Sequence, residues 1–520
     1  MGFKENYAVN DVESGSPPRG YTEDKHGVLV DETGAVRSEM FTYGDSTYAK
    51  IQRFAGRFNI EQRGIERVPE DERTDTTMSK VGTLWLSANM VVSSFAIGVL
   101  AVPIFDLGFV DALLTIFFIN ILGIFPVCFF STFGPIFGLR QMVLSRFYFG
   151  YYAVKLVAFF NVLACLGWSA VNVIVGAQLL NAVNGNVPGW AGIIVIAAAT
   201  FLITLFGYKV VHHYEYWSWI PSFIIFLIVL GEFAHSGSFD NIPRGYGSSE
   251  AGAVLSFAAS VFGFATGWTS YAADYTVYQP ANSSRMKIFL WTFGGLFFPL
   301  AFTEMLGLAI VTGTVNNPNL YAGYTNDSVG GLLAAVLSPL GGFGKFCLVI
   351  LALSIIANNC PNIYSVTFSL QVMARWTAAV PRFIWTFVGT LIYVAVAIPG
   401  YSHFSSALED FLLLIGYWLA IYEGIAVTEH VVFKRSRHAY HLPDYRNASA
   451  LPPGIAAIAA FCFGIMGAVL GMAQPWFTGP IGKLIGNPQY GGDVGFELAF
   501  AFTATSYVIL RTLEKKYFKR

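Results

Sequence analysis

Long apolar segments alternate with short polar stretches over most of the chain, and a polar stretch of about eighty residues precedes them. A helix needs about 20 apolar residues to cross a bilayer, so a window of that length separates membrane spans from loops. The window finds twelve candidate spans, at residues 81–104, 110–134, 152–181, 189–208, 216–236, 252–274, 287–313, 346–373, 382–400, 406–428, 452–474 and 494–512. This pattern predicts an all-α integral membrane protein with about twelve transmembrane helices.

Basic residues are divided unevenly between the loops on the two sides of these spans. If the N-terminus lies inside, the short inner loops contain twelve Lys and Arg residues and the outer loops contain three, Arg244, Lys345 and Lys483. Cytoplasmic loops are enriched in Lys and Arg, so both termini are predicted to be cytoplasmic. With this topology, Asn326 is the one glycosylation sequon of three that lies in an outer loop.

The count divides the chain into four regions. Residues 1–79 are expected to form a flexible cytosolic tail, 80–428 the core of spans one to ten, 429–512 a loop with spans eleven and twelve, and 513–520 a cytosolic C-terminal tail.

Charged residues make up 12% of the chain, about half the ~25% typical of soluble domains. The net charge of −1 argues against a nucleic-acid partner, whereas a lipid bilayer is required. The polar tails can carry signals for sorting or ubiquitination machinery.

Two similar glycine-containing runs indicate an internal repeat. Span one contains Ser94-Phe-Ala-Ile-Gly98 and span six contains Gly263-Phe-Ala-Thr-Gly267, five spans later and with the chain running in the opposite direction. An inverted repeat of five helices plus five helices places interrupted helices at such equivalent positions. Gly98 and Gly267 are therefore expected to shape the backbone at two interruptions. The alternative is that these small residues only let helices pack closely.

Span eight contains the motif Asn358-Asn-Cys-Pro-Asn-Ile-Tyr-Ser365, in which three amides and Pro361 interrupt an apolar helix. On a helix of 3.6 residues per turn, Ser354, Asn358, Asn362 and Ser365 share one face. A polar face inside a membrane points toward the protein interior or water, so it indicates a binding site. Interhelical hydrogen bonding is the alternative role for the same amides.

Spans three and six provide aromatic partners for these amides. Trp168 and Asn172 of span three are four residues apart and share a face, and Trp268 follows the glycine run of span six. Both Trp residues lie too deep for the interfacial belt. Indole rings stack on flat ligands, and Asn amides both donate and accept hydrogen bonds along the edge of a heterocycle. The combination favours a planar, uncharged ligand such as a nucleobase.

Four carboxylates lie within or beside the spans: Glu215, Asp274, Glu304 and Glu423. An intramembrane carboxylate is a functional candidate, here for proton coupling. The spans contain no metal-ligand spacing of His or Cys, no carboxylates paired at helical spacing and no nucleophile–base motif. We therefore expect neither an enzyme nor a cofactor, and we interpret the five cysteines as small buried hydrophobic residues.

These motifs together resemble those of the nucleobase–cation symporter-1 family, in particular its fungal purine–cytosine permeases. The resemblance extends from about residue 63 to the C-terminus and rests on LGWSAVN at 166–172, GWTSYAADY at 267–275 and NNCPNIYS at 358–365, with FGPIFGLRQMVLSRFYFG at 133–150. It implies the five-plus-five inverted-repeat fold of amino-acid transporters, of the LeuT type, with alternating access. It also implies uptake of adenine, guanine, hypoxanthine and cytosine across the plasma membrane.

The resemblance also implies roles for individual residues. The substrate-binding residues it implies are Ser94, Trp168, Asn172, Trp268, Asn358, Asn359 and Asn362. Pro361 is expected to shape the backbone, and Glu215 is similar to an acid required in this group. Bacterial relatives that use sodium hold it with two adjacent hydroxyls of span eight, whereas Ser354 provides one here. This departure favours protons, with Glu215, Asp274 and Glu304 as the coupling candidates.

Two other functions remain as alternatives. Pyridoxine is also a small planar ring, so a vitamin B6 transporter is the alternative within the same class. A non-transporting nutrient sensor is an alternative of a different class, but such sensors usually have long signalling tails.

Overall fold

The computed structural model describes the chain except residues 1–21, 24–28, 32–34, 37–46, 59 and 488–490. Its helices are α1 (Thr47–Gly56), α2 (Ser79–Asn89), α3 (Val92–Leu100), α4 (Phe109–Ser131), α5 (Gly134–Phe137), α6 (Gln141–Leu144), α7 (Arg146–Val183), α8 (Gly189–Phe206), α9 (Tyr208–Trp217), α10 (Trp219–Ser236), α11 (Gly247–Ala265), α12 (Arg285–Thr312), α13 (Pro318–Leu337), α14 (Gly342–Met373), α15 (Arg375–Ala378), α16 (Arg382–Gly400), α17 (Phe404–Thr428), α18 (Ile455–Gly471) and α19 (Gly495–Phe518). The strands form two short antiparallel pairs, β1 (Thr22–Glu23) with β2 (Leu29–Val30) and β3 (Ala473–Gln474) with β4 (Phe477–Thr478).

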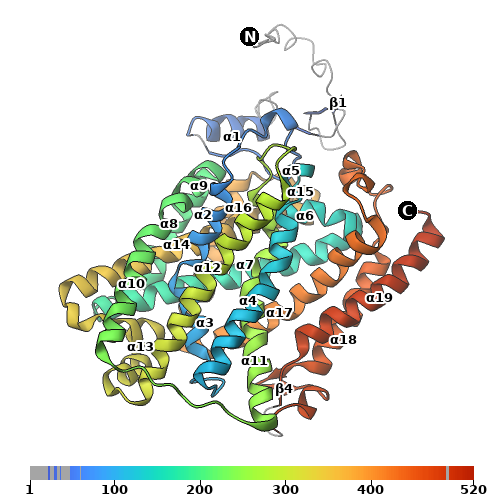
Figure 1. The fold of residues 1–520 in the computed structure, drawn as a ribbon. Coiled ribbons are helices and arrows are strands. Elements are labelled where there is room, and N and C mark those ends of the chain that lie inside the picture. Colours follow the sequence, from blue (N-terminus) through green and yellow to red (C-terminus); the bar gives the residue numbers. More distant parts are fainter. Residues whose placement is uncertain (1–21, 24–28, 32–34, 37–46, 59, 488–490) are drawn as a thin grey trace.

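The long helices form one bundle, with α1 across one end and α18 and α19 along one side (Figure 1). Among the described residues, ten helices are long and apolar enough to cross a membrane, or eleven if the bent pair α2 and α3 is one span. They follow the predicted spans in order. The predicted span eleven is α18, which is apolar but only 17 residues long. The structure is thus an all-helical membrane protein, as the apolar pattern predicts.

Spans one and six are both interrupted. In span one, α2 and α3 meet at an angle of 54° because Met90 and Val91 leave the helical conformation between them. In span six, α11 ends at Ala265 and continues as a 3₁₀ segment, Thr266–Tyr275, in which Tyr271 has non-helical φ and ψ of −143° and 19°. Such breaks leave backbone groups free inside the protein.

The glycine of span one has a different role from the one we predicted. Gly98 lies inside α3 rather than at the break, and an added Cβ would meet the carbonyl oxygen of Glu304 on α12 at 1.8 Å. Gly98 therefore permits close packing between spans one and seven, which was the alternative interpretation. Gly267 does lie beyond the end of α11, in the 3₁₀ segment, next to the indole of Trp168.

The pairwise packing of spans one to ten follows the inverted repeat. Span one (α2, α3) packs on α12 as span six (α11 and the 3₁₀ segment) packs on α4. The contact of α2 with α9 (spans one and five) corresponds to that of α11 with α17 (spans six and ten). The contact of α7 with α8 (spans three and four) corresponds to that of α14 with α16 (spans eight and nine). Helices α7 and α14, which are equivalent in the repeat, pack on each other. This arrangement places spans one, three, six and eight around a common centre.

The end of the predicted flexible tail is instead packed against the bundle. Three buried arginines donate to backbone carbonyls: Arg63 to Val36 at 2.6 Å, Arg67 to Phe137 at 2.9 Å and Arg73 to Pro135 at 2.7 Å. Burial lowers the pKa of Arg73 to about 10. The tail assignment was wrong for these residues because a polar sequence can also be buried when each charged group finds carbonyl partners.

Glu61 connects the same segment to several spans. Its carboxylate accepts from the hydroxyl of Tyr364 on α14 at 2.8 Å, from Tyr278 at 3.2 Å and from Arg140 at 3.3 Å. Arg382 of α16 lies 3.7 Å away. Burial, followed by the neighbouring Glu61 charge, raises the pKa of Tyr278 to about 12. One carboxylate therefore joins the N-terminal segment to spans eight and nine at this end of the bundle.

Candidate functional site

A small cavity lies at the centre of the bundle, where the broken span six faces spans three and eight. It is lined by Trp168, Phe264, Gly267, Trp268, Tyr271, Asn358 and Asn362. The two indoles and Asn358 and Asn362 are four of the predicted binding residues, so the structure brings them together. Most of the remaining surface is aromatic, which suits a flat ligand.

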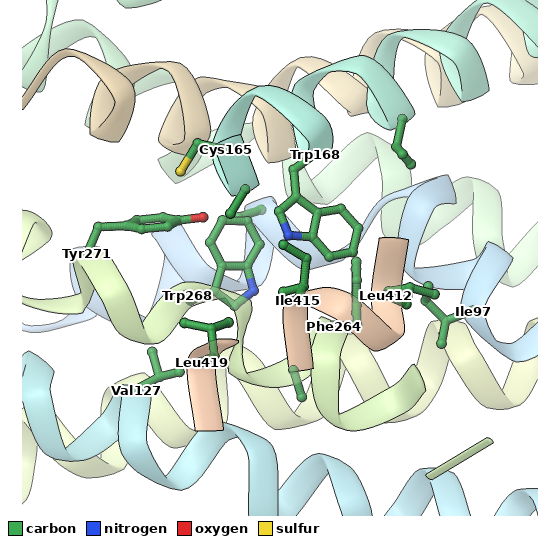
Figure 2. Close-up of a cluster of buried hydrophobic side chains, with 14 of the residues drawn as sticks. Ile97, Val127, Cys165, Trp168, Phe264, Trp268, Tyr271, Leu412, Ile415 and Leu419 are labelled. Carbon is green, nitrogen blue, oxygen red and sulfur yellow. The ribbon is translucent and has the colours of Figure 1, made fainter. Parts of the chain in front are cut away.

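The two indole rings are held by different contacts. Trp168 packs edge-to-face against Phe264 and Phe411, with ring centroids 5.2 and 5.0 Å apart. Trp268 packs in the same manner on Trp85 at 5.5 Å, and its Nε1 donates to Oδ1 of Asn89 at 3.2 Å. Figure 2 shows the two indoles side by side, with Tyr271 beyond Trp268. These contacts fix the orientation of both rings before any ligand binds.

The amides of spans three and eight form a hydrogen-bonded chain. Ser93 Oγ donates to Asn172 Oδ1 at 2.6 Å, and Asn172 Nδ2 donates to Asn358 Oδ1 at 2.7 Å. Asn358 Nδ2 then donates to the carbonyl of Ala88 at 2.6 Å, in the last turn of α2 before the break. The chain therefore connects spans one, three and eight directly beside the cavity.

Asn362 is fixed at both ends of its amide. Its Nδ2 donates to the carbonyl of Asn358 at 3.0 Å, and its Oδ1 accepts from the hydroxyl of Tyr271 at 2.7 Å. Pro361 lies within the continuous helix α14, and its carbonyl accepts from Tyr275 at 3.1 Å. The motif of span eight is thus bonded to two tyrosines of span six.

Two of the predicted substrate-binding residues, Asn359 and Ser94, lie outside the cavity lining. Asn359 points toward span four, where its Nδ2 donates to Thr200 Oγ1 at 3.4 Å, because one residue along a helix rotates the side chain by about 100°. Ser94 is buried and is not among the cavity-lining residues, whereas its neighbour Ser93 bonds Asn172. Within the described residues, the Ser94 hydroxyl has no hydrogen-bond partner.

The candidate carboxylates are buried and are not among the cavity-lining residues. Asp274 accepts from the backbone N–H of Gln141 at 2.7 Å, and Glu304 accepts from Asn120 at 2.7 Å. Glu423 of α17 accepts from Thr266, at the start of the 3₁₀ segment of span six. The carbonyl of Glu215 accepts from Ser87 of α2, while its carboxylate oxygens have no partner among the described residues.

Sequence reasoning missed Asn161. Its Oδ1 accepts from Ser270 Oγ at 2.6 Å, and its Nδ2 donates to Ser369 at 2.7 Å and to Ser365 at 3.1 Å. It thereby connects the 3₁₀ segment of span six to spans three and eight. Asn161 precedes Trp168 by seven residues, so the helical period of span three would have identified it as part of the same face.

The comparisons with known proteins identify the family. A family model described as "Permease for cytosine/purines, uracil, thiamine, allantoin" matches residues 67–482. The purine-cytosine permease fcyB of Emericella nidulans is 62% identical over 488 residues, covering 94% of this chain and 95% of that one. The purine-cytosine permease FCY2 of Saccharomyces cerevisiae is 44% identical and covers 99% and 98% of the two chains.

A solved structure supports the fold. Mhp1, described as a nucleobase-cation-symport-1 family transporter in a closed conformation with bromovinylhydantoin bound, matches with a TM-score of 0.64 and 13% identity, over 88% of this chain and 95% of that one. At that identity the match supports the architecture alone. The chain belongs to the family of membrane permeases for cytosine/purines, uracil, thiamine and allantoin, whose members are transporters and not enzymes.

Proposed function

We propose that this protein is a symporter that takes up purines and cytosine together with protons by alternating access. The observation that carries the proposal is the central cavity, where Trp168 and Trp268 lie with Asn358 and Asn362. The names of the two fungal relatives support purines and cytosine as the substrate class. Adenine, guanine, hypoxanthine and cytosine all have flat faces and polar edges that match the indoles and amides around this cavity, whose volume of about 10 Å³ must increase for a base to enter.

Recognition would divide between the rings and the amides. The indoles provide stacking surfaces, each contributing about 1–3 kcal/mol per base. The amides provide donors and acceptors at fixed positions, because Asn358 and Asn362 are each bonded to neighbouring groups. Binding at this point would involve both broken spans, since Asn358 bonds the last turn of α2 and Tyr271 belongs to span six.

The hydroxyl arrangement in span eight supports protons as the coupling ion. Ser354 is followed by Ile355 and Ile356, and its Oγ donates to the carbonyl of Leu351 in its own helix at 2.6 Å. A sodium site needs several oxygen ligands, which this turn does not provide with its side chains. Glu215, Asp274 and Glu304 are the proton-carrying candidates. Glu215 is adjacent to span one through Ser87.

Radiolabelled adenine uptake in a yeast strain without nucleobase permeases would test this function. Cells with the protein should accumulate adenine, and unlabelled cytosine and hypoxanthine should compete. A protonophore should abolish uptake, whereas replacement of sodium should not change it. Cells with empty vector provide the control, and a fluorescent tag would test the proposed plasma-membrane location.

Two results would contradict the proposal. Competition by pyridoxine, but not by cytosine, would indicate a vitamin B6 transporter. Uptake that requires sodium and resists the protonophore would refute proton coupling.

A further inference from the structure

Tyr271 lines the cavity at the point where the backbone of span six departs from a helix. Its φ and ψ of −143° and 19° interrupt the 3₁₀ segment three residues after Trp268. The ring packs edge-to-face on Trp268 with centroids 5.8 Å apart. Figure 2 shows its hydroxyl pointing toward Trp268 and Cys165. The side chain is therefore a wall of the cavity that carries a polar group.

The hydrogen-bonding role of this hydroxyl is determined by its neighbours. The carbonyl of Asn358 can only accept, so Nδ2 of Asn362 must face it, which leaves Oδ1 of Asn362 toward Tyr271. An amide oxygen also can only accept, so Tyr271 must donate its single proton there, at 2.7 Å. The Tyr271 oxygen then has only lone pairs left, so it can accept a further hydrogen bond but cannot donate one.

We infer that Tyr271 is a specificity-determining residue whose hydroxyl oxygen accepts a hydrogen bond from the exocyclic amino group of the substrate. This inference rests on the proposed nucleobase transport. A base with an amino group at that position satisfies the oxygen, whereas a base with a carbonyl there places two acceptors against each other. Sites that bond a polar group of the substrate reject analogues without it, because buried groups are left unpaired.

Adenine and hypoxanthine are suitable probes, because one has an amino group and the other a carbonyl at position 6 of the same ring system. Tyr271→Phe removes the acceptor and keeps the ring that packs on Trp268. The ratio of KM for hypoxanthine to KM for adenine should then fall by roughly 5- to 10-fold, the value of one hydrogen bond. KM is measured from the dependence of uptake on substrate concentration, so it does not depend on how much protein reaches the cell surface.

Tyr275→Phe is the matched control. Tyr275 lies one turn further along the same segment, and its hydroxyl donates to the carbonyl of Pro361 in the same motif at 3.1 Å, but it is not among the cavity-lining residues. The same chemical change there should alter uptake of both bases by the same factor. An unchanged ratio in Tyr271→Phe, or a ratio that rises, would overturn the inference.

A second measurement does not depend on the variant reaching the membrane. 6-Methylpurine has a methyl group in place of the amino group of adenine, so it should compete with adenine uptake by the unmodified protein at least 5-fold more weakly. Equal competition would show that no acceptor meets the amino group and would overturn the inference. If the unmodified protein takes up neither adenine nor hypoxanthine, the proposed function itself is wrong, which is a separate outcome.

Discussion

Asn172 and Asn358 bond each other directly, Nδ2 to Oδ1 at 2.7 Å, across the contact between spans three and eight. The sequence offered two roles for such amides, a binding site or interhelical bonding. In the structure Asn358 lines the cavity and Asn172 bonds it from span three, so one pair of amides is placed for both roles. Asn172 is itself held by Ser93 of span one. Its effect on a ligand would therefore be indirect.

We predict that Asn172→Ala raises KM for adenine and also lowers thermal stability in detergent. The substitution leaves Oδ1 of Asn358 and the hydroxyl of Ser93 without their partner, at a cost of about 1–3 kcal/mol for each buried group. Asn359→Ala is the control, because Asn359 faces Thr200 and span four. It should leave KM near that of the unmodified protein. A larger rise in KM for Asn359→Ala than for Asn172→Ala would contradict this assignment.

Trp168 should respond to loss of its aromatic face more than to loss of apolar volume. Trp168→Phe should retain part of the uptake, whereas Trp168→Leu should raise KM for adenine by roughly 5- to 150-fold, the stacking contribution of about 1–3 kcal/mol. Trp190→Leu is the control, because Trp190 on α8 is 56% exposed and is not among the cavity-lining residues. If Trp168→Leu kept the original KM, this ring would not stack on the substrate.

Gly98→Ala should destabilise the protein strongly. The added Cβ would lie 1.8 Å from the carbonyl oxygen of Glu304, so α3 and α12 would have to separate. Overpacking of this kind costs about 1–3 kcal/mol or more. Gly294 lies on α12, the helix that contains Glu304, and a Cβ added there would meet open space. Gly294→Ala should therefore be neutral or stabilising by up to about 1 kcal/mol. Thermal unfolding of the two purified variants would compare them, and equal melting temperatures would refute the close contact.

Asp493, in the loop before α19, should make stability depend on pH. Burial raises its pKa from the ordinary value of 3.8 to about 6, although the backbone N–H groups of Ala473 and Gly495 and the hydroxyl of Tyr417 bond its carboxylate. Between about pH 4 and pH 6 the folded protein therefore holds a proton that the unfolded chain has lost, so stability falls as pH rises through this window.

Asp493→Asn removes this titration and provides the test. The stability of the variant relative to the unmodified protein should increase by about 2–3 kcal/mol between pH 4 and pH 7, as expected for a shift of about two pKa units. Carboxylates that do not interact with Asp493 titrate equally in both proteins and cancel in the comparison. A difference between the two proteins that stays constant with pH would show that Asp493 keeps an ordinary pKa.

The sequence was sufficient for the spans, the inverted repeat and four of the residues that line the central cavity. Apolar length is a local property, so the spans could be identified from the chain, although α18 is shorter than the predicted span eleven. Trp168, Trp268, Asn358 and Asn362 could be recognised because stacking rings and amides are rare at mid-membrane depth and so stand out against an apolar background.

The tertiary structure was needed wherever the rotation or close approach of helices matters. It distinguished Ser93 from Ser94 and turned Asn359 toward span four, because neighbouring positions on a helix point about 100° apart. It assigned Gly98 to packing and placed the break at Met90 and Val91. Tyr271 became part of the site through the irregular backbone of span six, whose conformation depends on contacts with spans that are distant in sequence.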